Sequence, residues 1–408
     1  MMANPEPSYV EAQQTATVET PLVSAQTPPP QTPVAPTPTP TPTPPPIEKD
    51  APPESTPKPI RLNFGQRFGD WRICEKLDEG GFGQVYKVEH IKVKKLYAAM
   101  KAEPSDIEGG SAIKLEAKIM IKMNARARNE RRQHIVYLYY ARKRKRFNYM
   151  IVTLLGDNLK NLKMQCKDEK VPIPTWVRIG IQCLYCIKLV HDVGYIHRDI
   201  KPGNFIMGHH NDINRCRLVH VVDFGLARAF AVEVNGQWIV RRARGSVEFR
   251  GTARYCSPAV HEKFEQGRKD DLFSLMYMLI EFHCGLPWQR EKTRDRLEMV
   301  KLNVPDHILM KGFPEELQPV IPYLRSLNCY NRPDYSFIYD CCLQLMRRLN
   351  VNYTDKYAWE NEEQYARYMK KKRKRDDYEN AEEFFNYDPI GINDPPQKGE
   401  KTFEETRR

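Results

Sequence analysis

The chain has 408 residues, of which 41% are hydrophobic, and its formal net charge is +12 at neutral pH. This length allows roughly two to three domains, and the positive charge favours an anionic partner. Ten cysteines in so long a chain do not indicate a disulfide framework. There is no leader with a basic and then an apolar part, and no apolar run reaches the roughly 18–20 residues that a membrane span needs. We therefore expect a reduced, intracellular protein without a membrane segment.

Residues 1–60 are rich in proline and threonine. They contain 18 of the 32 prolines, include the repeat TPTPTPTP at 37–44, and hold six acidic residues against two lysines. Their net charge of −4 leaves +16 on residues 61–408. Because the segment has almost no large apolar side chains to bury, we predict that it is disordered. A flexible spacer is the favoured interpretation, and a polyproline ligand for an SH3 or WW domain is the alternative.

From residue 62 the composition becomes typical of a folded domain. The pattern predicts strands at 71–77, 84–88 and 96–101, a helix at 112–123, and two more strands at 135–140 and 149–154. The remainder is mainly helical, with long amphipathic or apolar patterns at 175–193, 269–284 and 336–349. A small β-rich half before a larger α-rich half predicts an α+β fold with two lobes and a cleft between them.

A glycine-rich stretch, Gly80-Gly81-Phe82-Gly83, separates the first two predicted strands. Glycines let backbone N–H groups approach phosphates closely, but most glycine clusters are only turns. A dinucleotide-binding fold needs a helix directly after the glycines. Here a second strand follows, and the third strand ends in Ala99-Met100-Lys101, which is the order in which protein kinases cover ATP.

Two further motifs are much more specific. Residues 197–204 read HRDIKPGN, and residues 223–225 read DFG, 24 positions after Asp199. Together with the upstream Lys101 and a helical Glu116, they form the protein kinase signature set. The sequence therefore indicates a two-lobed protein kinase fold.

Each residue of this set has a physical role, because catalysis of phosphoryl transfer is mostly positioning and charge neutralisation. We expect Lys101 to hold the α- and β-phosphate oxygens of ATP and Glu116 to orient Lys101. Asp199 is expected to accept or orient the proton of the incoming hydroxyl. Asn204 and Asp223 offer the oxygen ligands that Mg²⁺ prefers. The predicted cofactors are ATP and Mg²⁺.

Lys201 adds a signal for the acceptor amino acid. It lies two residues after Asp199, as in serine/threonine kinases, where a lysine at this position reaches the transferred phosphate. Tyrosine kinases usually have arginine or alanine nearby. Serine/threonine specificity is therefore the favoured prediction, with Lys201 as a fourth catalytic residue beside Asp199, Lys101 and Glu116.

Several longer segments resemble the casein kinase I group of protein kinases. They are HRDIKPGNF at 197–205, FRGTARY at 249–255, GRKDDLFSLMYMLIEF at 267–282, LPW at 286–288 and DKYAWE at 355–360, and they look most like the tau-tubulin kinase branch. The resemblance covers about residues 68–360 and implies a small lobe at about 68–154 and a large lobe at about 155–360. The usual Ala-Pro-Glu is replaced by Cys256-Ser257-Pro258-Ala259, a feature of this group. Asp271 would anchor the backbone of the catalytic loop.

The same resemblance implies which residues bind ATP, with Val152 as gatekeeper and residues 153–155 as the hinge. For each apolar member, ordinary core packing is the alternative. The predicted ATP-binding residues are Leu77, Gly80, Gly81, Phe82, Gly83, Val85, Ala99, Lys101, Val152, Thr153, Leu155 and Ile206.

One position departs from the kinase pattern. Asp78 stands where the first glycine of the phosphate loop is expected. A carboxylate near the nucleotide costs on the order of 1 kcal/mol when solvated, which weakens ATP binding without abolishing it. The alternative function is a pseudokinase scaffold that binds nucleotide and docks partners.

Casein kinase I relatives favour serines or threonines near acidic or phosphorylated residues, so the expected partners are acidic or phospho-primed protein substrates. Arg254 and Lys292 match positions that bind such an anion in the family. The stretch at 226–257, here called the activation segment, adds Arg241, Arg242, Arg244 and Arg250. Guanidinium groups bind phosphate bidentately. A solvated basic face is the alternative interpretation of each arginine.

Two basic runs complete the sequence. Residues 142–146, RKRKR, lie between predicted strands and indicate an exposed turn. Lys370 to Arg375, KKKRKR, lies in a charged tail at 361–408 that we predict to be disordered, and it indicates a nuclear localisation signal, an anionic docking patch or only a solvated tail. Neither run belongs to a recognisable nucleic-acid-binding module. We therefore expect a cytoplasmic or nuclear monomer that does not bind nucleic acid.

Overall fold

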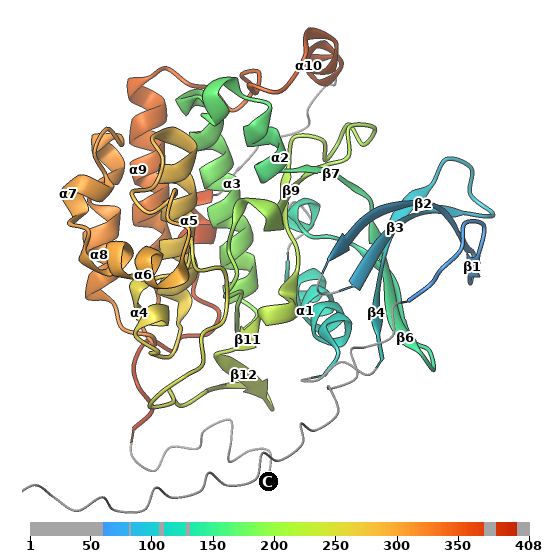
Figure 1. Cartoon of the computed structure of the whole chain (residues 1–408), viewed down its shortest axis with the longest axis horizontal. Coiled ribbons are helices and arrows are strands. Elements are labelled where there is room, and N and C mark those ends of the chain that lie inside the picture. The colour runs from blue at the N-terminus through green and yellow to red at the C-terminus, as the bar shows by residue number, and fades with distance from the viewer. Residues whose placement is uncertain (1–59, 81–82, 106–109, 128–130, 371–380, 398–408) are drawn as a thin grey trace, which may run out of the picture. The chain divides into compact units, whose positions relative to one another are not determined.

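The computed structural model describes residues 60–80, 83–105, 110–127, 131–370 and 381–397 (Figure 1). These residues all belong to one unit, Thr56–Arg408. The predictions for the proline-rich residues 1–59, for Gly81 and Phe82 of the phosphate loop, and for the basic residues 371–375 lie outside the described residues.

The N-terminal lobe is a curled antiparallel sheet with one helix beside it. The strand order is β1-β2-β3-β4-β6-β5. The strands are β1 (Arg67–Phe68), β2 (Trp71–Gly80), β3 (Gly83–His90), β4 (Tyr97–Pro104), β5 (Leu138–Lys143) and β6 (Phe147–Thr153), and the helix is α1 (Ala112–Arg126). Side chains alternate between the faces of a strand, so Ala98, Met100 and Ala102 of β4 are buried in the core of this lobe, while Ala99 and Lys101 lie on the opposite face.

One predicted strand is displaced along the chain. We expected a strand at 135–140, but the structure has the 3₁₀ turn η1 (Arg131–His134) and then β5, which begins at Leu138. Ile135 and Val136 are buried in the core that the large lobe builds, and the His134 ring is hydrogen-bonded to the Val219 carbonyl oxygen. The apolar run therefore packs against the other lobe before the strand begins.

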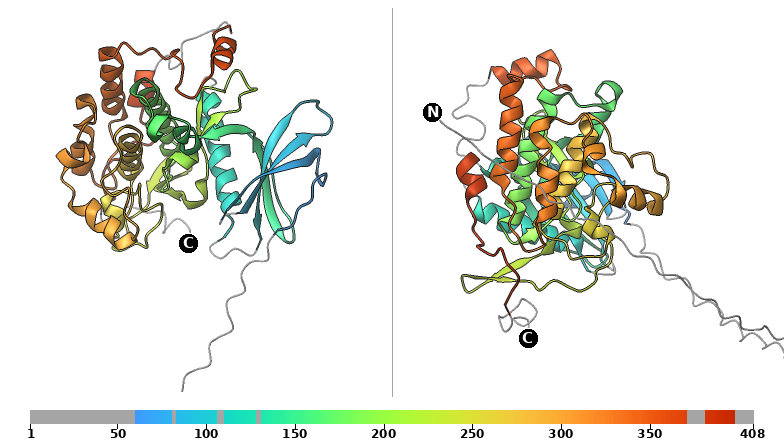
Figure 2. Two further views of the ribbon diagram at one scale, coloured as in Figure 1. Left: turned by 45° about the horizontal axis from the view of Figure 1, so that its top comes forward. Right: turned by 90° about the vertical axis from the view of Figure 1, so that its left-hand side faces the viewer.

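The C-terminal lobe is mainly helical, and its centre is the buried helix α3. α3 (Ile173–His191), α5 (Arg268–His283) and α9 (Tyr335–Arg348) are the helices that contribute the most residues to the large core. Shorter helices before residue 361 are α2 (Leu159–Met164), α4 (Pro258–His261), α6 (Arg294–Asn303), α7 (Asp306–Leu309) and α8 (Val320–Ser326), with the short turns η2 (Lys167–Glu169) and η5 (Glu315–Leu317). The predicted α+β fold with a β-rich and an α-rich half is confirmed (Figures 1 and 2).

Short strands and turns carry the motif residues on the side of the C-terminal lobe that meets the sheet. They are β7 (Leu155–Asn158), β8 (Tyr195–Ile196), η3 (Pro202–Asn204), β9 (Phe205–Gly208), β10 (Val219–Val221), η4 (Phe224–Leu226), β11 (Arg228–Ala229), β12 (Ala231–Val234) and β13 (Gln237–Val240). β9 pairs with β7 and β10, and β11 pairs with β8. These pairings fix the loops that bear Asp199 and Asp223.

Helix α3 is also long and apolar enough to span a membrane, whereas we expected no apolar run of that length. Its most apolar stretch is 89% buried inside the fold, as in the core helix of a globular domain. Cys183 and Cys186 are fully buried on this helix, and all ten cysteines are free thiols. Cys183 and Cys186 are therefore core residues.

Beyond residue 360 the structure contradicts the predicted disordered tail. Two helices, α10 (Glu362–Met369) and α11 (Ala381–Asn386), pack on the C-terminal lobe. Their aromatic side chains find partners on it: Phe384 stacks on Tyr185 with 4.1 Å between ring centroids, and Tyr368 lies beneath the Arg217 guanidinium at 4.3 Å. Residues 361–370 and 381–397 are therefore ordered parts of the lobe.

Candidate active site

Lys101 and Glu116 meet between the sheet and α1. The Lys101 ammonium forms an ion pair with the Glu116 carboxylate and a second one, 3.1 Å long, with Asp223 Oδ1. Burial disfavours the charged ammonium, but the two carboxylates outweigh it and raise the pKa of Lys101. Lys101 is therefore a permanently charged group inside the cleft, as phosphate binding requires.

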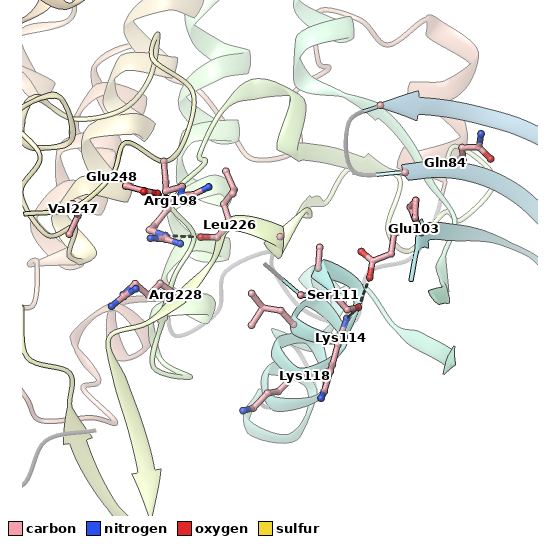
Figure 3. Close-up of a pocket in the computed structure, with 18 of the residues that line it drawn as sticks. Gln84, Glu103, Ser111, Lys114, Lys118, Arg198, Leu226, Arg228, Val247 and Glu248 are labelled. Atoms are coloured by element: carbon pink, nitrogen blue, oxygen red, sulfur yellow. Dashed lines mark hydrogen bonds and ion pairs between the residues drawn. The ribbon is translucent and has the colours of Figure 1, made fainter. Parts of the chain in front are cut away.

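The start of α1 explains how Glu116 reaches this position. Ser111 caps the helix by accepting a hydrogen bond from the Lys114 amide (3.0 Å). Glu103 at the end of β4 accepts hydrogen bonds from the Ser111 hydroxyl and from the Ile113 amide. These bonds, part of which is drawn in Figure 3, join α1 directly to the strand that carries Lys101.

Asp199 is held by three polar neighbours. Its Oδ2 accepts a hydrogen bond from the Lys201 ammonium (2.6 Å), and its Oδ1 accepts one from the Thr252 hydroxyl (2.6 Å). Asn204 Nδ2 donates to the Asp199 carbonyl oxygen (2.8 Å). The structure thus brings the predicted Asp199, Lys201 and Asn204 together. Thr252 was missed as a site residue, although it stands inside the FRGTARY segment.

Asp271 of α5 holds the backbone of the catalytic loop, residues 197–204. Its carboxylate accepts hydrogen bonds from the His197 amide (2.7 Å), the Arg198 amide (2.9 Å) and His191 Nε2 (2.9 Å). Arg198 has a φ of 67°, a left-handed conformation that a non-glycine residue keeps only where its surroundings hold it. The predicted anchoring role of Asp271 matches this geometry.

Asp223 is turned into the cleft by a left-handed backbone (φ 66°, ψ 69°). Phe224 behind it is buried and packs against the His197 ring, 5.4 Å away between centroids. The Val222 amide donates to the Asn204 carbonyl oxygen (2.9 Å), which ties this segment to the catalytic loop. The two predicted magnesium ligands therefore stand on adjoining segments.

The chemistry of these two side chains fits Mg²⁺. Burial alone would raise the pKa of Asp223, but the Lys101 ammonium lowers it overall, so the carboxylate is ionised. The side-chain amide nitrogen of Asn204 donates hydrogen bonds to Asp199. Its amide oxygen is therefore available as a metal ligand. In the described parts of the chain no group of three or more His, Cys, Asp and Glu side chains could hold a metal, so the magnesium site would rest on these two oxygen donors and the nucleotide phosphates.

The predicted adenine pocket lies on the cleft side of the sheet. Ala99 faces Val152 across β4 and β6, and Val85 faces Lys101 across β3 and β4. Leu77 is 44% exposed, and Val85, Ala99, Val152 and Ile206 are only partly buried. Val152 packs against the large core, and the exposed parts of these side chains beside Lys101 are available to a ligand.

The hinge and the phosphate loop border this pocket. Thr153 ends β6 and its hydroxyl accepts a hydrogen bond from the Tyr137 amide (3.0 Å), and Leu155 begins β7. Gly80 pairs with Gly83 at the end of the β2–β3 hairpin. Gly83 has a φ of +124°, and a Cβ there would collide with the Ala102 carbonyl oxygen, so this position requires glycine.

A cavity of about 1140 Å³ opens between the hairpin, α1 and the activation segment (Figure 3). Lys114 and Lys118 on α1 line one wall, and Arg198, Arg228 and Arg244 line the other. Burial and the neighbouring Arg228 guanidinium lower the pKa of Arg198 to about 10. The cavity therefore carries an excess of positive charge next to the catalytic loop.

Only part of this charge is balanced within the described residues. Glu265 pairs with Arg244 (2.7 Å) and Arg228 (3.5 Å), and Glu248 pairs with the exposed Arg250 (2.8 Å). Of the arginines named in the sequence analysis, Arg244 and Arg250 line the cavity. The sequence did not indicate that Arg198 and Arg228 join them.

Arg254 and Lys292, the predicted anion-binding pair, lie on the C-terminal lobe. The Arg254 guanidinium donates to Glu281 Oε1 (3.2 Å) and to the Gln289 carbonyl oxygen (3.3 Å). Lys292 is exposed. The charge of Arg254 is therefore partly neutralised, while its side chain remains 40% exposed.

Comparison with known proteins gives one matching family and several relatives, and their names agree with one another. The sequence matches the family described as protein kinase domain over residues 71–348. It is 36% identical to a Caenorhabditis elegans protein named a putative serine/threonine-protein kinase, over 74% of this chain and 85% of that protein. It is 39% identical to the inactive tau-tubulin kinase ttbk-6 of the same organism, over 71% and 99%. A probable serine/threonine-protein kinase of Dictyostelium discoideum is 33% identical over 72% of this chain and 57% of that protein.

Proposed function

The chain belongs to the serine/threonine branch of the protein kinase family, and we propose that it is an active, casein kinase I-type enzyme that transfers the γ-phosphate of ATP to serine and threonine hydroxyls. The observation that carries the proposal is the assembled polar network. Lys101 is paired with Glu116 and Asp223, and Asp199 is held by Lys201 and Thr252.

The chain's own residues account for the steps of the reaction. Lys101 binds phosphate oxygens of ATP with a charge that its buried carboxylate partners maintain. Asp199 accepts a hydrogen bond from the acceptor hydroxyl and orients it toward the phosphate. Lys201, 2.6 Å from Asp199, stabilises negative charge on the transferred group. Mg²⁺ bound by Asn204 and Asp223 would neutralise charge on the nucleotide phosphates.

A nucleotide-binding scaffold without activity is the second candidate function. The relative ttbk-6 is named inactive, and Asp78 departs from the phosphate-loop pattern. Asp78 is exposed and accepts a hydrogen bond from the Glu79 amide (2.8 Å), so solvent screens its charge from the nucleotide. The complete catalytic network favours the enzyme.

Phosphate transfer from ATP·Mg²⁺ to casein tests the proposal. We expect labelled phosphate on serine and threonine, and a loss of at least about 100-fold in Lys101→Met, because the variant removes the buried cation that binds phosphate. The matched control is Lys311→Met, which changes an exposed lysine outside the site. Nucleotide binding without transfer, also after Asp78→Gly, would favour the scaffold.

We further propose that the enzyme selects acidic or phospho-primed substrates. The support is the basic surface around the catalytic loop, where Arg198, Arg228 and Arg244 line a cavity, together with Arg254 farther along the activation segment. Guanidinium groups recognise phosphate and carboxylate through paired hydrogen bonds.

Arg254→Gln should discriminate between primed and unprimed peptides. We expect KM for a phospho-primed peptide to rise about ten-fold, the size of one charge-assisted hydrogen bond, while KM for the unprimed peptide stays unchanged. Glutamine is preferred to glutamate because Glu281 lies 3.2 Å away. Arg296→Gln on the exposed side of α6 is the control. Equal losses with both peptides would contradict a role of Arg254 in priming.

A further inference from the structure

The segment from Ala381 to Asn393, here called the C-terminal brace, lies beyond the residues that match the kinase family. Its helix α11 inserts Phe384 and Phe385 into the main core of the C-terminal lobe. Phe385 packs edge-on against Tyr185 of α3 and lies 4.9 Å from the Tyr339 ring of α9. The brace is therefore attached by buried aromatic contacts.

Arginine side chains of the lobe fix the path of the brace after α11. Arg332 donates to the carbonyl oxygens of Phe385 (2.6 Å) and Tyr387 (3.1 Å), and it lies 3.8 Å from the Asp388 carboxylate. Asn331 donates to the Asn393 carbonyl oxygen (2.9 Å). These bonds hold the brace on a path that runs from α9 to the first residue of α5.

At that point the brace supplies hydrogen-bond acceptors to Nη2 of Arg268. Arg268 is 3% exposed, and its Nη2 donates to the carbonyl oxygens of Tyr330 and Ile392, each at 2.6 Å. Its guanidinium also lies 4.7 Å from the Phe230 ring of the activation segment. A buried guanidinium needs acceptors for its protons, and the brace supplies one of the two strongest.

Arg268 connects these contacts to the catalytic parts of the molecule. It is the first residue of α5, three positions before Asp271, which holds the catalytic loop. The Phe230 amide donates to the Gly194 carbonyl oxygen (3.0 Å). The hydroxyl of Tyr330 accepts a hydrogen bond from the Ala243 amide (2.7 Å). The activation segment therefore contacts Arg268 directly through the Phe230 ring and indirectly through Tyr330, which accepts from both Arg268 and Ala243.

We propose that the C-terminal brace positions the activation segment through Arg268, so that a segment outside the kinase match is required for efficient binding and phosphorylation of the protein substrate. The ATP pocket is built from the sheet and the hinge, and the brace makes no hydrogen bond to either within the described residues. Loss of the brace should therefore affect the acceptor peptide and leave ATP binding unchanged.

Two deletions in the otherwise complete chain test this proposal, which rests on the proposed kinase activity. Removal of residues 388–408 takes away the contacts to Arg268 and leaves the aromatic residues of α11 in place. Removal of residues 398–408 is the matched control, because Ile392 and Asn393 remain. Thermal unfolding of both proteins verifies that they are folded.

For the longer deletion we expect a fall of about ten-fold in kcat/KM for the peptide, the size of one lost buried hydrogen bond to a charged group. KM for ATP should change less than about two-fold, and amide hydrogen exchange in residues 228–250 should become faster. The control deletion should match the full chain. Equal effects of the two deletions, or unchanged exchange in residues 228–250, would overturn the proposal.

A double-mutant cycle separates positioning from general destabilisation. Arg268→Met should reduce kcat/KM for the peptide, and its effect should be smaller in the chain that lacks residues 388–408, because both changes break the interaction between Arg268 and the brace. Independent, multiplying effects would count against the brace acting through Arg268. Hydrogen exchange also decides the question if the chain transfers no phosphate, so failure of this inference and failure of the proposed function are distinguishable.

Discussion

Replacement of Asp199 by asparagine is expected to lower kcat by about 10²- to 10⁴-fold, the range for loss of a positioned general base. The carboxylate uses Oδ1 for Thr252 and Oδ2 for Lys201. An amide keeps only one of these two acceptors and brings an N–H group against a donor. The acceptor hydroxyl then loses the group that orients it, while the contacts of Lys101 with ATP are unchanged.

Single-turnover phosphate transfer and nucleotide binding by calorimetry measure the two effects separately. Nucleotide affinity should stay within about three-fold of the unmodified chain. Asp295→Asn changes an exposed carboxylate of α6 and serves as the matched control. Retention of most of the activity in Asp199→Asn would contradict the role assigned to Asp199.

The catalytic residues could be predicted because their chemistry and spacing are local. Asp199, Lys201 and Asn204 lie within six consecutive residues, and the turn η3 that follows Lys201 holds them together. Lys101 and Asp223 stand 122 positions apart, yet each sits in a motif with a defined role. The protein kinase fold then brings these two residues together.

Contacts between segments without such motifs could not be predicted. Thr252 reaches Asp199 across 53 positions, and the FRGTARY segment that contains it does not indicate which catalytic residue it contacts. Arg228 and Arg198 meet because β11 pairs with β8, where Arg228 faces Ile196. Strands of two residues are too short to show the alternating pattern by which a strand is detected in a sequence.

The ordered tail was missed for a compositional reason. Residues 361–408 are highly charged, which is typical of disorder, and their seven aromatic residues stand among charged side chains. Phe384 and Phe385 are ordered by Tyr185 and Tyr339, which lie far away in sequence. Their burial depends on the tertiary surface that α3 and α9 build together.

Asp271→Asn is expected to reduce both stability and activity. The Asp271 carboxylate is 2% exposed and accepts three hydrogen bonds, from the amides of His197 and Arg198 and from His191. An asparagine offers one acceptor oxygen and directs an N–H group at a buried donor. We expect the free energy of unfolding to fall by about 2–4 kcal/mol, and kcat to fall because Arg198 and Asp199 lose their backbone support.

The pH dependence of unfolding identifies this carboxylate. Burial alone would raise the pKa of Asp271, but the hydrogen bond and charge of His191 lower it overall. A pKa lower in the folded than in the unfolded chain means that the stabilisation is present above the ordinary value of about 4 and is lost as the pH falls through the folded pKa. Urea unfolding should therefore show a smaller loss of stability between about pH 5 and the folded pKa in Asp271→Asn than in the unmodified chain. The control is Asp306→Asn, which removes an ion pair with Arg325 at the surface. If Asp271→Asn lost as much stability in acid as the unmodified chain, another carboxyl group would dominate the acid sensitivity of the fold.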